Sequence, residues 1–170
     1  MKSHERFRWA TVAMDIRADD NILEVGCGVG FAVQAIVPLL SKGKITAIDK
    51  SPAAIIRAHQ RNEVAVLQGK VEFLQVDLLQ LPKQSLRYQK AFCFNINFFW
   101  TKNSIAQECE VIRSLLAKDG KLYIFYGPMI GNEWKKNLQT ASANLKKEKF
   151  YVTNSVYEAQ LKCYYLSATL

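Results

Sequence analysis

Three glycines at alternate positions, Gly26, Gly28 and Gly30, follow an apolar run that begins at Asn21. Glycine reaches positive φ without a steric penalty and lets the backbone approach a ligand closely. In open α/β sheets, a glycine-rich turn between a strand and a helix holds a nucleotide-like ligand. A tight turn without a ligand is the alternative, but it does not explain why five positions hold three glycines. We therefore predict a nucleotide-like ligand at this turn.

Two acids end later strand-like runs. Asp49 comes 19 positions after Gly30. At this place, such sheets have an acid that accepts hydrogen bonds from both ribose hydroxyls of the ligand. Asp77 ends the next run, where a carboxylate can accept a hydrogen bond from an adenine amino group. The alternatives are a helix cap at Asp49 and a plain loop acid at Asp77. Together with the glycines, these acids predict one adenosine-bearing ligand.

The spacing of the glycines argues against a pyrophosphate. A dinucleotide fingerprint reads G-x-G-x-x-G, with a third glycine that allows close packing beneath the pyrophosphate, whereas here all three glycines are two positions apart. Glu24, just ahead of them, would repel a phosphate but could stabilise the ammonium of an amino acid tail. A nicotinamide oxidoreductase is therefore disfavoured.

The elements that must position these residues alternate between strand and helix. This pattern is typical of βαβ units around a parallel sheet, with helices on both faces. The predicted strands cover residues 21–26, 44–49, 71–77, 90–97 and 121–126. The predicted helices cover residues 6–16, 31–39, 52 to about 69, 104–118, and Asn132 to about Lys147. Pro38 should bend the second of these helices, and Gly120 should close the fourth. In the third, Val64 and Leu67 are expected on the apolar side. Two strand-like segments, 150–157 and 160–169, end the chain without a helix between them, so they must pair as an antiparallel hairpin.

The segment Ile22–Gly30 resembles the cofactor motif E-x-G-x-G-x-G of the class I S-adenosylmethionine-dependent methyltransferases and matches it at every defining position. The resemblance extends from about Asn21 to the end of the chain and includes Asp49, Asp77 and the terminal hairpin. It implies a Rossmann-like, mostly parallel α/β sheet of seven strands in the order 3-2-1-4-5-7-6, with the last strand antiparallel.

The resemblance also implies which residues bind S-adenosylmethionine. The glycine turn, together with Glu24 and Cys27, would lie against the amino acid tail, and Asn95 would face the methionine portion. Asp49 would hold the ribose hydroxyls and the stem of Lys50 would cover them. Asp77 and the backbone of Leu78 would meet the adenine.

The acceptor side of the site is expected at Asn95–Trp100, which leaves the fourth strand at the edge where ligands bind. Asn95, Asn97 and Trp100 are the candidate catalytic residues; the alternative for the aromatic residues is a hydrophobic plug, above all at Phe99. Ile96 and Asn97 replace both prolines of the N-P-P-Y signature of amino-methylating nucleic-acid enzymes, which disfavours base methylation. In the first helix, His4, Arg8 and Trp9 are candidates for acceptor contacts from a lid, with core packing as the alternative for Trp9.

Composition limits the partners. The chain has 170 residues, which predicts a single domain over residues 1–170. Its net charge of +8 permits attraction to nucleic acid, although the lysines of the last helix fit a solvated face. The four cysteines form no C-x-x-C pair, so we expect buried free thiols and no metal site. The chain has neither a signal-peptide core nor an apolar run of about 18 residues, so we expect no membrane association and a cytoplasmic location.

These features predict an S-adenosylmethionine-dependent methyltransferase that acts on a small molecule. An RNA methyltransferase is the first alternative, and a non-catalytic cofactor-binding module is the second. No large insertion interrupts the end of the sheet, so the acceptor pocket would be shallow or completed by a second subunit in a homodimer.

Overall fold

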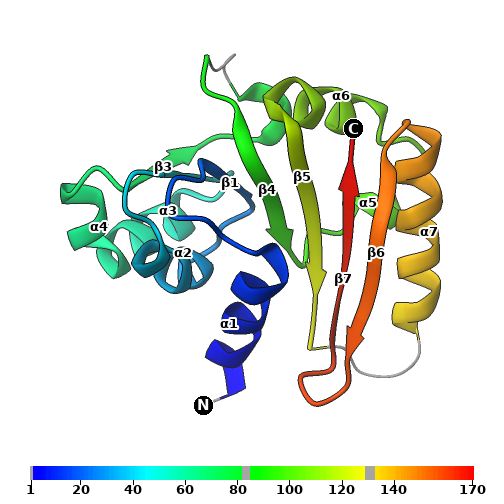
Figure 1. The fold of residues 1–170 in the computed structure, drawn as a ribbon, viewed down its shortest axis with the longest axis horizontal. Helices are drawn as coiled ribbons and strands as arrows, with labels where there is room; N and C mark the ends of the chain where they lie inside the picture. The colour runs from blue at the N-terminus through cyan, green and yellow to red at the C-terminus, as the bar shows by residue number, and fades with distance from the viewer. Residues whose placement is uncertain (1, 82–84, 129–132) are drawn as a thin grey trace.

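The computed structural model describes residues 2–81, 85–128 and 133–170. Seven strands form one sheet in the order β3-β2-β1-β4-β5-β7-β6 (Figure 1). β7 pairs antiparallel with both β5 and β6, and the other pairs are parallel. The predicted fold class, strand order and terminal hairpin are thereby confirmed. The strands are β1 (Ile22–Val25), β2 (Ile45–Asp49), β3 (Val71–Gln75), β4 (Tyr88–Phe94), β5 (Leu116–Tyr126), β6 (Tyr151–Glu158) and β7 (Cys163–Thr169).

Helices cover both faces of the sheet because successive strand residues point to opposite sides. Ile22 and Phe92 pack into a core with α1, α2 and α3, whereas Leu23 and Cys93 pack into a second core with α6 and α7. The helices are α1 (Lys2–Met14), α2 (Phe31–Ile36), α3 (Pro52–Arg61), α4 (Glu63–Leu67), α5 (Phe98–Thr101), α6 (Ala106–Leu115) and α7 (Glu133–Lys147), with short 3₁₀ turns η1 (Val37–Leu39) and η2 (Leu78–Gln80). As predicted, α2 gives way to η1 around Pro38. Asn132, the predicted start of α7, lies outside the described residues.

The carboxyl ends of the central strands meet at one edge. Val25 pairs with Ile48 of β2 and with Cys93 of β4, so the segments that follow these strands leave the sheet together. In Figure 1, β4 and β5 point towards the lower end of the molecule, where α1 begins. This edge is the one at which open α/β sheets bind ligands.

The helix predicted from residue 52 to about 69 is wrong in two respects. It is two helices, because the backbone leaves helical geometry at Asn62 (φ −118°), whose side chain donates to the carbonyls of Gly30 and Ala58. Val64 and Leu67, which we expected on the apolar side, are exposed by 68% and 81%. After the break, Ala65 and the partly buried Val66 are the α4 residues that pack against the core.

The boundary between α6 and β5 also differs from the prediction. We expected the helix to continue to Lys118 and to end at Gly120, but it ends at Leu115 and β5 already begins at Leu116. Leu116 pairs with Tyr88, and the register then shifts before Lys90 pairs with Lys121. Gly120 lies inside the strand, where a Cβ would come within 2.8 Å of the Tyr88 carbonyl oxygen. The glycine therefore allows a close strand approach instead of capping a helix.

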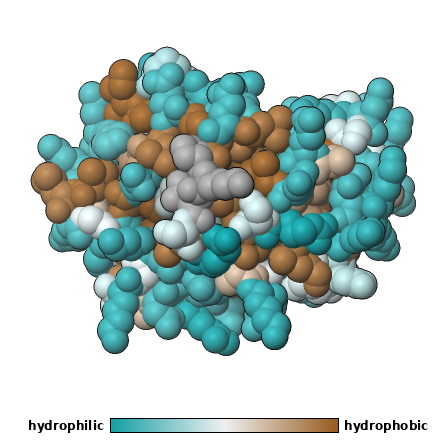
Figure 2. Space-filling view, turned by 90° about the horizontal axis from the view of Figure 1, so that it is seen from above, coloured by the Kyte–Doolittle hydropathy of each residue, from teal (hydrophilic) through white to brown (hydrophobic). Residues whose placement is uncertain are grey.

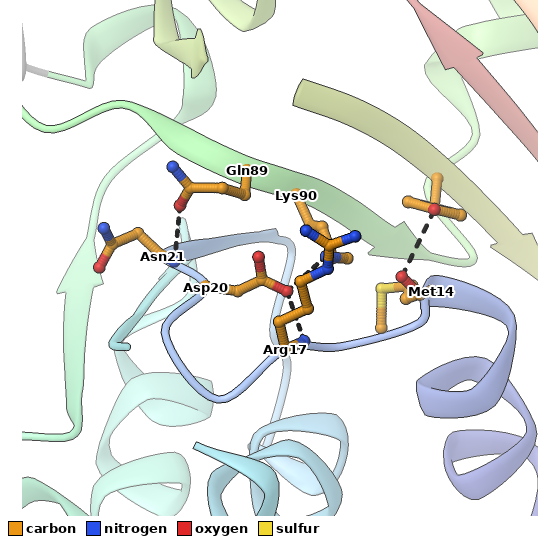
Figure 3. Close-up of polar contacts among 7 residues, drawn as sticks. Met14, Arg17, Asp20, Asn21, Gln89 and Lys90 are labelled. Atoms are coloured by element: carbon orange, nitrogen blue, oxygen red, sulfur yellow. Dashed lines mark hydrogen bonds and ion pairs between the residues drawn. The ribbon is translucent and has the colours of Figure 1, made fainter. Parts of the chain in front are cut away.

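A cluster of polar side chains lies at the opposite end of the central strands, where β1 and β4 begin (Figure 3). Asp20, between α1 and β1, forms a buried ion pair with Lys90 of β4 and accepts a hydrogen bond from the Arg17 amide at 2.7 Å. Gln89 accepts a hydrogen bond from the Asn21 amide at 2.8 Å. These contacts attach the start of β1 to β4. Seen from above, this side of the molecule carries apolar patches interleaved with hydrophilic side chains (Figure 2).

The four cysteines are free and buried, as predicted. Among the helices of the described residues, none is both long enough and apolar enough to span a bilayer.

Candidate cofactor and acceptor site

The glycines of the turn after β1 have different surroundings. Gly28 has φ of +53° and open space where a Cβ would lie, whereas a Cβ on Gly30 would come within 2.6 Å of Asn62 Nδ2 and 3.1 Å of the Ala58 Cβ. Gly28 therefore leaves room for a ligand, and Gly30 lets α3 pack closely against the turn. Contact of Gly30 with a ligand stays a prediction, whereas the packing of α3 gives its missing side chain a structural reason.

A side chain covers the first glycine of the turn. Ile96 Cδ1 occupies the place where a Cβ on Gly26 would lie. The sequence does not point to this contact, because Ile96 follows β4, the neighbour of β1 in the sheet. Ile96 is thus part of the wall above the glycine turn.

Asp49 connects β2 to the glycine turn. Its Oδ2 accepts a hydrogen bond from the Gly28 amide at 2.8 Å, and its Oδ1 accepts one from the Ser51 amide at 2.9 Å. Each carboxylate oxygen has a second lone pair that can accept another donor. Asp49 therefore holds the turn in place and keeps acceptor capacity towards the cavity.

Glu24 lies beneath the glycine turn as a buried acid. Only 2% of the residue is exposed, and its Oε2 is buried without a hydrogen-bond partner in the described part of the chain. Burial, and to a smaller extent the neighbouring charge of Asp49, raises the pKa of the Glu24 carboxyl well above its usual range. A cationic group bound at the turn would satisfy this carboxyl and favour its ionised form.

We expect Glu24→Gln to change how stability depends on pH. An acid whose pKa is raised on folding still holds its proton in the folded state at pH values where the unfolded chain has lost it. The wild-type protein should therefore lose stability relative to the variant as the pH rises from about 4.3, the usual glutamate pKa, towards the raised pKa of Glu24. Urea unfolding of both proteins across this range measures the difference. A difference that does not change with pH would contradict the assigned environment of Glu24.

A cavity of about 380 Å³ opens at the carboxyl edge, within the size range of small-molecule sites. Seven predicted site residues line it, namely Gly26, Asp49, Lys50, Asp77, Leu78, Asn95 and Asn97. The side chain of Asp77 also caps η2 by accepting from the Leu79 amide at 3.0 Å. The other predicted site residues are not among its lining residues: Glu24, Cys27, Gly28, Gly30 and Trp100. Burial raises the pKa of the Cys27 thiol, which keeps it in the neutral form.

Asn95 has a structural role that the sequence did not indicate. It leaves β4 with φ of +56°, and its side chain donates to the Gly127 carbonyl at 3.2 Å and accepts from the Gly127 amide at 2.9 Å. Its side-chain amide thus connects the ends of β4 and β5. Asn95 also lines the cavity, and its methyl-facing role stays a prediction.

The aromatic residues after Asn97 separate into cavity wall and core. Phe98 lines the cavity, whereas Phe99 is 1% exposed and belongs to the core, as the plug interpretation expected. The Trp100 ring lies 3.9 Å from the Tyr126 ring, centroid to centroid. Trp100 therefore packs against the end of β5, and its catalytic role stays a prediction.

The first helix packs its aromatic residues onto the sheet. The Trp9 ring contacts Phe125 and Tyr165 at centroid distances of 5.7 and 5.4 Å, so the core-packing alternative describes Trp9. Arg8 and His4 are exposed, and His4 contacts the ring of Phe31 edge-on at 5.3 Å.

The sequence analysis missed two charged residues that line the cavity. Lys102 and Glu108 both line the cavity and form an ion pair, and Glu108 is only 4% exposed. The helical spacing could have revealed Glu108, because it places this residue on the same face of α6 as Ile105 and Ile112, and that face is buried. An acid on an apolar stripe is the pattern that indicates a buried polar contact.

Comparison with known proteins identifies the family. A family model described as "Methyltransferase domain" matches residues 22–120, more than half of the chain. The chain belongs to this methyltransferase family. The matched range begins at β1 and includes the glycine turn, both predicted adenosine acids and all the residues that line the cavity.

The relatives of this methyltransferase chain are distant. It is 27% identical to cycloartenol-C-24-methyltransferase 1 of Oryza sativa over 82% of its own length and 39% of the rice protein. It spans between 30% and 45% of the first three curated relatives that it matches. A crystal structure of a SAM-dependent methyltransferase from Aquifex aeolicus superposes with a TM-score of 0.76 at 18% identity, covering 95% of this chain and 88% of that one.

The same fold also carries other chemistry. The cyclase SpnF superposes with a TM-score of 0.75 at 16% identity, covering 94% of this methyltransferase chain and 62% of SpnF. At these identities the likeness establishes the fold alone, so the reaction must be argued from the site.

Proposed function

We propose that this chain transfers the methyl group of S-adenosylmethionine to a small-molecule acceptor, with residues 1–170 acting as one catalytic domain. The observation that carries the proposal is the cavity at the carboxyl edge, which brings together acids from the ends of β2 and β3 and the glycine turn after β1. No other arrangement of the described residues combines these groups around a space of this kind.

The residues present fit this cofactor. The unpartnered Oε2 of Glu24 matches the cofactor's ammonium, and the open space at Gly28 gives the amino acid tail room beside the backbone. The free lone pairs of Asp49 match two ribose hydroxyls, and Asp77 and Leu78 border the end of the cavity where the adenine would lie.

The bound cofactor would supply a sulfonium methyl group that is already activated. The chain then has to hold the acceptor in line with the methyl group and exclude water, since positioning supplies most of the rate in such a transfer. Ile96 and Phe98 give the cavity an apolar wall next to the end of β4. Because Asn95 fixes the ends of β4 and β5 to each other, this wall is held in a defined position.

Calorimetry with S-adenosylhomocysteine, the demethylated cofactor, tests the proposal. We expect binding in the micromolar range, and no measurable binding of NAD under the same conditions. Tighter binding of NAD than of S-adenosylhomocysteine would overturn the assignment of the cofactor.

RNA binding is measured alongside, with a structured RNA at about 0.15 M and at lower salt. The small-molecule assignment predicts no measurable affinity at the higher salt. Binding that persists there and falls steeply as salt rises further, as phosphate contacts require, would favour an RNA acceptor instead.

A further inference from the structure

A half-buried arginine stands at the carboxyl edge without a carboxylate partner. Arg6 of α1 donates from Nη1 to the Gly127 carbonyl at 2.9 Å, while its Nε lies buried without an acceptor in the described part of the chain. The ion pairs of the described residues join Lys90 to Asp20 and Lys102 to Glu108, so none of them includes Arg6. Glu158, an acid near Arg6 at the end of β6, accepts a hydrogen bond from the Gln160 amide at its Oε1.

The surroundings of Arg6 are aromatic and fixed. Its guanidinium carbon lies 4.6 Å from the centre of the Phe7 ring and 6.0 Å from that of the Phe94 ring. Phe7 in turn contacts Phe94 edge-on at 4.9 Å. The charge is therefore held in place by packing, and an arginine guanidinium in such a position presents a planar set of donors that suits an oxyanion.

The strand order places Arg6 on the acceptor side of the methyl group. Under the proposed function, the adenosine lies at the ends of β3 and β2 and the amino acid tail at the end of β1, so the cofactor extends along the edge towards β4. β5 is the next strand beyond β4. Arg6 contacts Gly127 just after β5, and Gly127 is hydrogen-bonded to the side chain of Asn95, which lines the cavity.

We propose that Arg6 selects an acceptor with an oxyanion, a carboxylate or a phosphate monoester, by binding that group at the ends of β4 and β5. The proposal rests on the proposed function, because the position of the cofactor defines the acceptor side. A partly desolvated cation without a counter-charge is stabilised by an anionic ligand, and the paired donors of arginine favour two-point binding to carboxylate or phosphate oxygens.

The test uses the complex of the full chain with S-adenosylhomocysteine and three small probes. Benzoate and phenyl phosphate carry an oxyanion on a ring that fits the aromatic surroundings, and benzamide is the neutral control of similar shape. Titrations followed by NMR at the Arg6 Nε–H signal should show both anions shifting this signal, with at least tenfold tighter binding than benzamide. The anion that binds more tightly identifies which oxyanion the site prefers.

Variants separate this role from a structural one. Arg6→Gln should remove the preference for anions over benzamide and leave affinity for S-adenosylhomocysteine within about twofold. Arg57→Gln, the same change of charge at an exposed position of α3, should retain the preference. If Arg6→Gln does not fold, Arg6→Lys keeps the charge and should weaken both anions at least threefold, because it loses the planar set of donors.

Two results would overturn the proposal. One is equal affinity of benzoate, phenyl phosphate and benzamide for the wild-type complex. The other is a tenfold loss of S-adenosylhomocysteine affinity in Arg6→Gln, since Arg6 would then hold the carboxylate of the cofactor itself. Failure of S-adenosylhomocysteine to bind the wild-type chain is a separate outcome, and it contradicts the proposed function.

Discussion

Replacing Lys90 by methionine is expected to lower the free energy of unfolding by about 3–5 kcal/mol, the usual cost of removing one partner of a buried ion pair. The side chains of Lys90 and Asp20 are 10% and 4% exposed, so the variant leaves the charge of Asp20 without a partner and largely out of water. The Arg17 amide still donates to Asp20, but one neutral donor does not replace a counter-charge. Urea denaturation followed by tryptophan fluorescence measures the loss.

The double variant Asp20→Asn/Lys90→Met distinguishes the pair from simple packing. It removes both charges and keeps an oxygen that accepts from the Arg17 amide, so it should recover at least half of the lost stability. Lys118→Met, at an exposed position of the same edge, is the control and should change stability by less than about 0.5 kcal/mol. Equal losses in the single and double variants would show that the charge of Asp20 is not the cause.

Asp49→Asn is expected to weaken S-adenosylhomocysteine binding by about 1.5–3 kcal/mol, or roughly 10- to 150-fold. In the wild type, each carboxylate oxygen accepts from one backbone amide, at Gly28 and at Ser51. An asparagine turns one of these acceptors into a donor, so one amide faces a donor and the ribose loses a charged acceptor. Calorimetry gives the affinity, and thermal unfolding reports the cost to the fold.

The matched control for this variant is Asp119→Asn, which makes the same substitution at an exposed position of the opposite edge. It should leave both affinity and melting temperature unchanged. If Asp49→Asn lowered the melting temperature and left the affinity intact, Asp49 would serve only to hold the glycine turn.

The sequence by itself determined the features that depend on local pattern. Alternating and helical periodicities located the strands of the sheet to within about three residues, apart from the early start of β5 at Leu116, because burial of one face imposes a fixed repeat. The glycines of the turn and the acids at Asp49 and Asp77 were predictable because each lies at or just after the end of a strand. The short link between the last two strands required an antiparallel hairpin.

The tertiary structure alone decided which distant residues meet. The extension of β5 back to Leu116 follows from pairing with Tyr88, which competes with the helix that local spacing favours. Ile96 covers Gly26 because β4 lies beside β1 in the sheet. Arg6 reaches Gly127 across 121 positions of the chain, and packing around β1 buries Glu24 Oε2 without a hydrogen-bond donor among the described residues. Periodicity records which side of an element is buried, whereas the partner of a buried polar group depends on the packing of elements far apart in sequence.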